Sequence, residues 1–592
     1  KVVPARALDL KLGLVLVVVE RTARKPLGIA AVARLDPRPV RGRSGVAAPG
    51  TVAKLPAQPR AAPVARRDPL RPRDRRSPRV HRQPQRDRAG PACGYRQTRL
   101  AGLHRRGREL STRHLAGPRL RRLGYAAAGV IVLAALWFSA DWQNITRAAI
   151  GLDPVETAYP FWISVAAIAT LAFIFVVFVF LCAGWAFVDS WLKRVITGRA
   201  RLVLTFLLFG WLIWAIFDGF LIQTAFRIAN ETYRTADSFI EPSIAPPTSP
   251  LRTGSAASLV GWKQLGRRGR EYISRTPTRE EISEFVPDGA MEPIRVYVGL
   301  NAAETSKARA ELALRELLRV GAFERSVLVL MVPVGTGWMD PGGQDTMEFM
   351  LGGDVATVAV QYSYLRGAWS ILADSERGRE QGQALFDAVY SRWRRLPKQD
   401  RPRLYLHGLS QGAFISQQTL SLADMLDDPI NGALWVGSPF FSPLWRRIRE
   451  NRQPESPAWR PAYGNSSLAR SGNQHGGFDL PDRPWGPIRL AFLNYGSDPI
   501  VVFDYASAYR QPDWMSAPRA PDVASELRWF PIVTMLQIAL DTSVSLNVPG
   551  YGHYYIAPHY IDAWAAVLAP SGWNAEKSKL LKDIFLRRPP PV

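Results

Sequence analysis

A serine flanked by glycines, between a short apolar run and a helix-like stretch, constrains the fold of this chain most. Residues 403–406 predict a strand and residues 411–424 a helix, with Gly408-Leu409-Ser410-Gln411-Gly412 between them. In a G-x-S-x-G turn of this kind, the serine takes a strained conformation and exposes its hydroxyl above a sheet. Gly408 and Gly412 keep side chains out of a place where two backbones nearly touch. The alternative is a glycine-rich turn with an inert serine.

Strands and helices alternate from Pro293 onward. The expected strands cover residues 294–300, 326–332, 355–362, 403–406, 433–436 and 488–495, and the expected helices include 302–320 and 377–396. This alternation predicts an α/β fold with a doubly wound, mostly parallel sheet. Ligands of such sheets bind beyond the carboxyl ends of the strands, which is where Ser410 falls.

A serine hydroxyl is a weak nucleophile until a base, usually histidine, takes its proton. Three histidines follow Ser410, namely His475, His553 and His559. His553 lies in a glycine-rich loop, Pro549-Gly550-Tyr551-Gly552-His553-Tyr554, which can bring an imidazole over the edge of the sheet. We predict His553 as the base, with His559 as the second choice. His475 precedes the last expected strand and so has the wrong place in the chain order. The competing interpretation is a hydrogen-bonded loop histidine without a catalytic role.

The base needs a carboxylate to orient it, and in this fold the acid falls between serine and histidine in the chain. Asp498 follows the expected strand 488–495, which puts it on the loop where an acid partner is required. Asp504, Asp513 and Asp541 are alternatives, and a turn-capping role for Asp498 before Pro499 competes.

Two backbone N–H groups should stabilise the oxyanion that forms during the reaction. Gln411, the residue after the serine, supplies the first. Val334-Gly335-Thr336-Gly337-Trp338 follows the expected strand 326–332, so Thr336 and Gly337 are candidates for the second. A plain tight turn is the competing interpretation. The predicted chemistry needs neither a metal nor a cofactor, and Cys93 and Cys182 are too far apart in the chain to suggest a zinc site.

Three apolar runs precede this part of the chain, at residues 123–140, 158–188 and 202–222. Because about 20 residues span the hydrocarbon, they predict three transmembrane helices. A buried soluble helix fits the second run badly, since an uncharged stretch this long has no solvent face. Asp218 in the third run would be costly at mid-membrane, and we expect it near the outer interface or against another helix.

Basic residues set the expected orientation of these helices. Arg119, Arg121 and Arg122 precede the first run, and Lys193, Arg194, Arg199 and Arg201 lie between the second and third. The loop 141–156 carries three acidic residues and one arginine. By the positive-inside rule, the N-terminal side is cytoplasmic and everything after residue 225 is extracytoplasmic.

The charge of the chain is concentrated at its N-terminal end. Residues 1–122 hold 31 Lys or Arg against 7 Asp or Glu, whereas the remaining residues hold 45 against 43. The almost neutral body argues against a nucleic-acid partner for the folded part. The Arg/Pro-rich stretch 1–122 has no sustained period. It is interpreted as a lipid-contacting tail, as a nucleic-acid-binding arm, or as sequence read in the wrong frame.

The rest of the chain divides into two further regions. Residues 226–291 form a proline-containing connector, in which 262–272 either lies on the membrane surface or is a solvated linker. Residues 292–592 form the catalytic domain, with an irregular insertion at about 438–487 that contains Trp445, Trp459 and Trp485. The insertion is either a lid that shapes a substrate pocket or a surface excursion with a small core of its own.

The chain resembles the α/β-hydrolase superfamily, and more closely a bacterial family of membrane-anchored α/β-hydrolases that is frequent in actinobacteria. The matching stretches are 290–300, Gly335-Thr336-Gly337-Trp338, Gly408 to Gly412, Ser497-Asp498-Pro499 and Gly552-His553-Tyr554. The resemblance covers residues 123 to 580 and departs at 1–122. It implies N-terminal transmembrane helices in the bacterial plasma membrane and a C-terminal serine hydrolase domain.

We therefore expect a membrane-anchored serine hydrolase that acts on a lipid or cell-envelope acyl ester, with acyl transfer as a related option. Its expected partners are the lipid bilayer and the ester substrate. The alternative from another class is a non-catalytic membrane scaffold or transport accessory that keeps a hydrolase fold.

Overall fold

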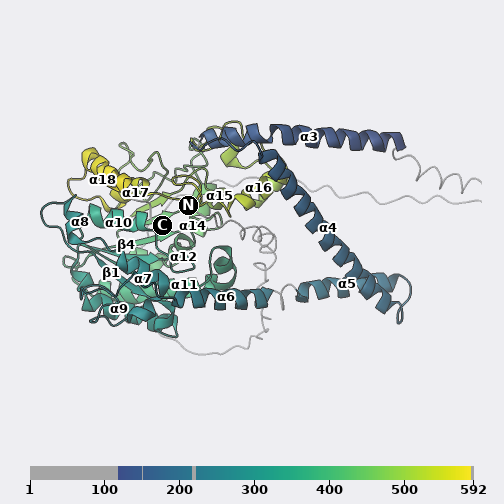
Figure 1. Cartoon of the computed structure of the whole chain (residues 1–592). Coiled ribbons are helices and arrows are strands. Elements are labelled where there is room, and N and C mark those ends of the chain that lie inside the picture. The colour runs from purple at the N-terminus through teal and green to yellow at the C-terminus, as the bar shows by residue number, and fades with distance from the viewer. Residues whose placement is uncertain (1–117, 150, 217–221, 589–592) are drawn as a thin grey trace, which may run out of the picture. The chain divides into compact units, whose positions relative to one another are not determined.

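The computed structural model describes residues 118–149, 151–216 and 222–588 (Figure 1). The predictions for the basic stretch 1–122 therefore fall almost entirely outside the described residues, and so does the prediction for Asp218.

One parallel sheet organises the C-terminal half, with the strand order β1-β3-β2-β4-β5-β7-β6. The strands are β1 (Ile294–Val298), β2 (Val327–Val332), β3 (Val355–Val360), β4 (Arg403–Leu409), β5 (Gly432–Val436), β6 (Ala469–Gly472) and β7 (Arg489–Leu493). The register pairs Val332 with Gly408 and Leu409 with Val436, so β2, β4 and β5 end together. The predicted α/β class with a doubly wound parallel sheet is confirmed.

Helices cover both faces of this sheet, as expected for strands that are apolar and buried almost throughout. Helices α9 (Ser306–Arg319) and α11 (Ala368–Arg394) pack together on one face. Helices α10 (Pro341–Met350), α17 (Ala557–Leu568) and α18 (Ala575–Arg587) pack together on the other (Figure 1). The Trp564 indole N–H donates to Gly343 O at 2.7 Å and fastens α17 to α10.

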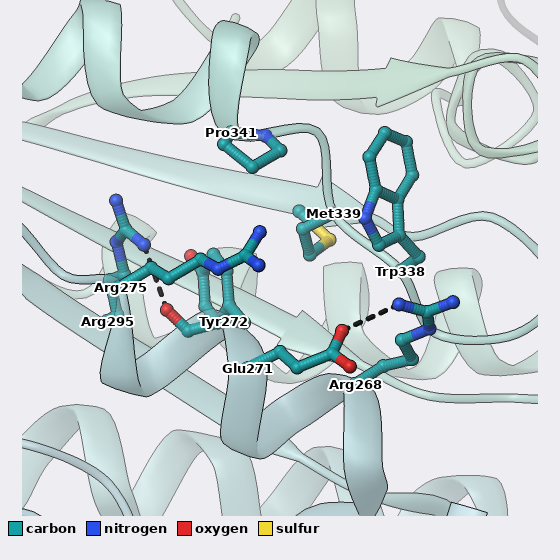
Figure 2. Close-up of a pocket in the computed structure, with 8 residues that line it drawn as sticks. All are labelled: Arg268, Glu271, Tyr272, Arg275, Arg295, Trp338, Met339 and Pro341. Atoms are coloured by element: carbon teal, nitrogen blue, oxygen red, sulfur yellow. Dashed lines mark hydrogen bonds and ion pairs between the residues drawn. The ribbon is translucent and has the colours of Figure 1, made fainter. Parts of the chain in front are cut away.

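Residues 260–290 belong to the same hydrophobic core as the sheet. Leu265 and Ile273 are fully buried at the two ends of α7 (Gly266–Ser274), and Ile282 is fully buried in α8 (Arg279–Ser283). Tyr272 hydrogen-bonds Thr357 on β3 at 2.7 Å. Figure 2 shows α7 facing the stretch Trp338–Pro341 across a small pocket. Neither a solvated linker nor a membrane-surface segment describes α7.

The N-terminal helices are α3 (Pro118–Ala149), α4 (Tyr159–Leu192), α5 (Arg199–Trp214) and α6 (Ile222–Ser238). Within the described residues, two helical stretches are long and apolar enough to cross a membrane, Arg122–Ala148 and Tyr159–Leu192. They contain the first two predicted spans. The third prediction, 202–222, begins in α5 and runs into residues 217–221, which are not described.

The remaining elements are short. They are η3 (Trp262–Leu265), η4 (Leu300–Ala302), η5 (Ala322–Glu324), α12 (Gln411–Gln417), α13 (Leu422–Asp427), α14 (Pro443–Glu450), α15 (Pro499–Val502), η6 (Tyr505–Ala508), η7 (Asp513–Met515) and α16 (Val533–Asp541). The predicted helix 411–424 is divided between α12 and α13. The insertion 438–487 contains α14 and β6, and Trp445 is buried in the main core.

Candidate active site

Ser410 lies between β4 and α12 in the strained conformation that the sequence predicts. Its φ of 57° and ψ of −121° are unusual for a residue with a side chain. A Cβ on Gly408 would collide with the backbone of Gly412, and a Cβ on Gly412 would collide with Val332 O on β2. Both glycines are therefore required by close backbone approach, and this turn holds the half-buried Ser410 at the carboxyl edge of the sheet.

His553 and Asp498 form a buried pair. Asp498 Oδ2 lies 2.6 Å from His553 Nδ1, and the two residues are 0% and 5% exposed. Asp498 comes from the loop after β7, where it caps α15, and its Oδ1 accepts the Ile500 N–H at 2.9 Å. The other ring nitrogen, His553 Nε2, is buried without a hydrogen-bond partner. An imidazole held at Nδ1 by a carboxylate and free at Nε2 has the arrangement of a general base.

The end of β5 brings this pair to the nucleophile turn. Ser410 donates its backbone N–H to Val436 O at 2.8 Å. A Cβ on the next residue, Gly437, would collide with the His553 ring. Ser410 and His553 thus contact two adjacent residues of one segment. No hydrogen bond joins Ser410 Oγ to His553 Nε2 here, and such bonds often tighten only when substrate is bound.

The loop that carries His553 is fastened to the loop that carries Asp498. Ser497, beside Asp498, accepts the Gly552 N–H at 3.1 Å, and the same hydroxyl donates to Asp522 Oδ2 at 2.7 Å. The His553 N–H donates to Ser545 O at 2.8 Å. These bonds fix the backbone on which the acid and base stand.

The other histidines have different surroundings. His559, the second choice for the base, lies in α17 with its Nδ1 2.5 Å from the Tyr495 hydroxyl, and burial lowers its pKa to about 4. His475 is exposed in the turn after β6. His407, which precedes the serine on β4, is buried with its Nδ1 2.8 Å from Leu434 O. Burial lowers the pKa of His407 to about 4.

The alternative acids are also engaged elsewhere. Asp504 accepts the Ala506 N–H at 2.9 Å and caps a 3₁₀ turn. Asp513 pairs with Arg452 at 3.2 Å on the surface, and Asp541 is an exposed residue at the end of α16. Among the four candidates, only Asp498 hydrogen-bonds a histidine in the described part of the chain.

The expected oxyanion donors divide into two groups. Gln411 is the first residue of α12, where backbone N–H groups have no partner within the helix. The Gly337 N–H, by contrast, donates to Val334 O at 2.7 Å inside its own turn, so it is not available. Thr336 remains the candidate from this loop. Its carbonyl accepts from Gln361 Nε2 at 3.2 Å, and this bond does not use the Thr336 N–H.

Two features of the site were not predicted from the sequence. Tyr555 donates its hydroxyl to Asp498 Oδ2 at 2.7 Å, so this oxygen accepts two side-chain donors. Asp340, after the Gly335–Gly337 loop, accepts the Tyr560 hydroxyl at 2.7 Å. Burial raises the pKa of Asp340 to about 6, and the hydrogen bonds from the Tyr560 hydroxyl and the Gly342 N–H oppose this rise. The signals were a tyrosine two residues after His553 and the dipeptide Asp340-Pro341, which repeats Asp498-Pro499.

Within the described residues, no group of three or more His, Cys, Asp or Glu has the arrangement of a metal site.

Comparison with known families gives two matches. The alpha/beta-hydrolase family matches residues 294–581, and the N-terminal part of an alpha/beta-hydrolase family matches residues 91–277. The N-terminal match begins at residue 91, so it includes part of the stretch 1–122 in which the sequence resemblance departs from the family. No curated protein matches the chain.

Solved structures with a partial likeness include two of acetylxylan esterase, one of them an iodinated complex. They are 16% and 17% identical, have a TM-score of 0.19, and cover 30% of this chain and 85% of their own. A structure of the metagenome-derived lipolytic enzymes LipS and LipT is 17% identical, with a TM-score of 0.14. The match covers 23% of this chain and 51% of that chain. At these TM-scores the likeness carries no argument about substrate or mechanism.

Proposed function

This chain belongs to the alpha/beta-hydrolase family, and we propose that it is a serine hydrolase that cleaves carboxylic esters. One observation carries the proposal: His553 is held at Nδ1 by Asp498 at 2.6 Å, and its Nε2 is buried and unpaired beside the nucleophile turn. A buried ring nitrogen without a hydrogen-bond partner lowers the stability of the fold, so its presence calls for an explanation such as a catalytic role. Acceptance of the Ser410 proton is the function that its place suggests.

In the first half of the proposed reaction, Ser410 Oγ attacks the ester carbonyl carbon while His553 Nε2 takes the hydroxyl proton. Asp498 keeps the Nδ1–H tautomer and stabilises the imidazolium. The Gln411 and Thr336 N–H groups hold the oxyanion. The bond to the alcohol oxygen then breaks, His553 returns the proton to that oxygen, and the alcohol leaves an acyl-Ser410.

In the second half, water gives its proton to His553 Nε2 and its oxygen bonds to the acyl carbon. The bond to Ser410 Oγ breaks and the proton returns to the serine, so the products are a carboxylic acid and an alcohol. An alcohol in place of this water would give acyl transfer through the same steps.

We also propose that the apolar helices α3 and α4 anchor the protein in a membrane. Their lengths and composition permit spanning, and the side chains of 173–181 on α4 are exposed and apolar. With the third span that the sequence predicts at residues 202–222, and in the orientation that the basic residues favour, the catalytic domain is extracytoplasmic. Its substrate is then an ester at the outer membrane surface or in the cell envelope.

Labelling with a fluorophosphonate probe tests the serine chemistry, because the probe reacts only with an activated serine. The wild-type protein should be labelled and should hydrolyse 4-nitrophenyl butyrate, and Ser410→Ala should lose both. Ser543→Ala changes an exposed serine in the turn after α16 and should keep both. A folded wild-type protein with neither label nor turnover would contradict the proposed function.

A reporter fused after Val592 tests the orientation. A reporter that is active only outside the cytoplasm should give signal, and one that is active only inside should not. The reverse pattern would place the catalytic domain in the cytoplasm.

A further inference from the structure

A cavity of about 550 Å³ opens beyond the carboxyl ends of β5 and β7. The loop after β5 and helix α14 form one wall, including Phe440, Trp445 and Trp459. The segment from α15 to η7 forms the other, including Phe503 and Trp514. This volume and this aromatic lining suit a small-molecule site, and the place is where parallel sheets bind ligands.

The same segments carry the cavity walls and the acid–base pair. Tyr495 lines the cavity, and its ring stacks at 4.1 Å on Tyr555, whose hydroxyl donates to Asp498. Phe441, which also lines the cavity, packs with its ring centroid 4.9 Å from that of Phe414, four residues after the nucleophile Ser410. Ser410 and His553 do not line the cavity themselves, and its walls are joined to the reacting groups through these aromatic contacts.

Four arginines line this cavity, against three acidic residues, and the acids are already engaged. Glu450 lies 3.9 Å from Arg446, Asp513 lies 3.2 Å from Arg452, and Asp504 caps a 3₁₀ turn through the Ala506 N–H. Each acid thus has a partner of its own. The two arginines that remain decide the charge that the cavity offers to a ligand.

These two arginines are Arg449 and Arg510. Within the described residues, neither has a carboxylate oxygen within 4.0 Å. Arg449 is half-buried and donates from Nη1 to Val501 O at 3.0 Å, and Arg510 is exposed at the rim. Burial lowers the pKa of Arg449, and the charges of Asp504 and Glu450 oppose this effect. An unpaired guanidinium in such a site favours an anion that can bond two of its N–H groups.

Hydrogen-bonding capacity in the walls points the same way. The indole N–H groups of Trp445 and Trp514 are buried without partners. These two indole groups, and the two guanidinium groups that lack a carboxylate partner, are all donors. A ligand that satisfies donors must be rich in acceptor oxygens, as phosphate and carboxylate groups are.

We propose that this cavity binds an anionic group, phosphate or carboxylate, on the ester that Ser410 cleaves, with the aromatic walls holding the attached apolar part. The inference rests on the proposed ester hydrolysis and names its substrate class, an anionic amphiphilic ester. Arg449 and Arg510 are the specificity-determining residues.

Titration of the full-length protein in a neutral detergent, with octyl phosphate as the probe, tests this inference by binding alone. Octanol is the neutral counterpart, and inorganic phosphate separates a free anion from an amphiphile. We expect octyl phosphate to bind and to compete with 4-nitrophenyl butyrate, phosphate to bind more weakly, and octanol to bind weakest. If phosphate binds as tightly as octyl phosphate, the site takes a free anion and the amphiphile assignment is wrong.

Substitutions assign the binding to this cavity. Arg449→Gln and Arg510→Gln should each weaken octyl phosphate binding about tenfold or more, as loss of a charged hydrogen bond does. Arg447→Gln, exposed on the same helix and outside the cavity lining, should leave it unchanged. Arg510 is exposed, so its variant remains informative if Arg449→Gln does not fold.

Ester turnover and octyl phosphate binding, measured side by side, separate the two proposals. Ser410→Ala should lose turnover and keep binding. Octyl phosphate binding without any ester turnover by the wild type would contradict the hydrolase and keep the anion site. Turnover with equal binding of octyl phosphate and octanol, or with no effect of either arginine substitution, would overturn the anion site and keep the hydrolase.

Discussion

Asp498 and Asp340 begin α15 and α10 in the same way, at the same edge of the sheet. Each precedes a proline and accepts the N–H two residues further on at 2.9 Å, that of Ile500 for one and Gly342 for the other. Each also accepts a tyrosine hydroxyl at 2.7 Å from the C-terminal part of the chain, from Tyr555 and Tyr560. The two carboxyl groups thus share one local design.

The difference lies in the third partner. His553 Nδ1 lies 2.6 Å from Asp498 Oδ2, whereas no histidine hydrogen-bonds Asp340 in the described chain. An Asp-Pro pair after a strand therefore fixes a helix start and a cap, and says nothing about catalysis. The glycine-rich loop 549–554, which carries His553, makes the difference: it contacts Asp498, which can orient a base, whereas Asp340 caps a helix without a histidine partner.

Replacing each aspartate with asparagine tests this distinction with the largest expected effect. Asp498→Asn keeps the cap but favours the wrong His553 tautomer, so kcat should fall by about 10³- to 10⁴-fold. Asp340→Asn should lower kcat less than about tenfold, because it orients no base. Steady-state kinetics on 4-nitrophenyl butyrate, with circular dichroism as the folding control, decide the matter. Equal losses would erase the difference drawn between the two carboxyl groups.

Several groups with shifted pKa values should contribute to the pH dependence of stability. The pKa of Asp345 and Asp541 is raised to about 6, and that of His407 and His559 is lowered to about 4. Asp340 is one further such group. Burial raises its pKa to about 6, against about 3.9 in an unfolded chain. Between about pH 4 and 6 the unfolded state releases this proton while the folded state keeps it. The Asp340 contribution to stability therefore falls as pH rises through this range, by on the order of 2 kcal/mol given the partial exposure of Asp340.

Thermal unfolding midpoints measured at pH 4, 5, 6 and 7 check this expectation. The midpoint of Asp340→Asn should rise relative to that of the wild type between pH 4 and 6, because the variant lacks the Asp340 contribution. Asp513→Asn, which changes an exposed carboxyl group, should retain this contribution. A difference between Asp340→Asn and the wild type that stays constant from pH 4 to 7 would show that Asp340 does not hold the proton.

Removing the tyrosine hydroxyls compares the two clusters more finely. Tyr555→Phe takes one of three donors from Asp498 and should lower kcat about tenfold with little change in KM, because the oriented base is weakened rather than substrate binding. Tyr560→Phe should lower kcat less than about threefold. A larger loss in Tyr560→Phe would give Asp340 a role in the reaction that its contacts do not suggest.

His559→Gln should have the smallest effect. Burial lowers the pKa of His559 to about 4, so the ring is neutral at the pH of the assay and bonds Tyr495 rather than an acid. We expect kcat within about threefold of wild type, whereas His553→Gln should abolish measurable turnover. The pair of variants decides which of the two histidines is the base.

The sheet could be predicted because its strands are apolar, short and separated by helices, and the nucleophile turn because its glycines are obligatory. Strand β6 was missed, since Ala469-Arg470-Ser471-Gly472 has no strand pattern and its pairing is imposed by β7. The burial of α7 was missed because polar arginines dominate its sequence. Tyr555, Asp340 and the arginine-lined cavity depend on contacts between distant segments, which no local pattern encodes.

The bond from Gly552 to the Ser497 hydroxyl has a consequence for any opening of this edge. Because Ser497 adjoins Asp498 and Gly552 adjoins His553, this bond couples the loop that carries the acid to the loop that carries the base. Asp498 and His553 should then move together as a pair. A bulky ester that displaces the C-terminal loop would shift this pair relative to Ser410 without breaking the contact between Asp498 and His553. Substitutions that widen the entrance to the site should therefore displace Asp498 and His553 together.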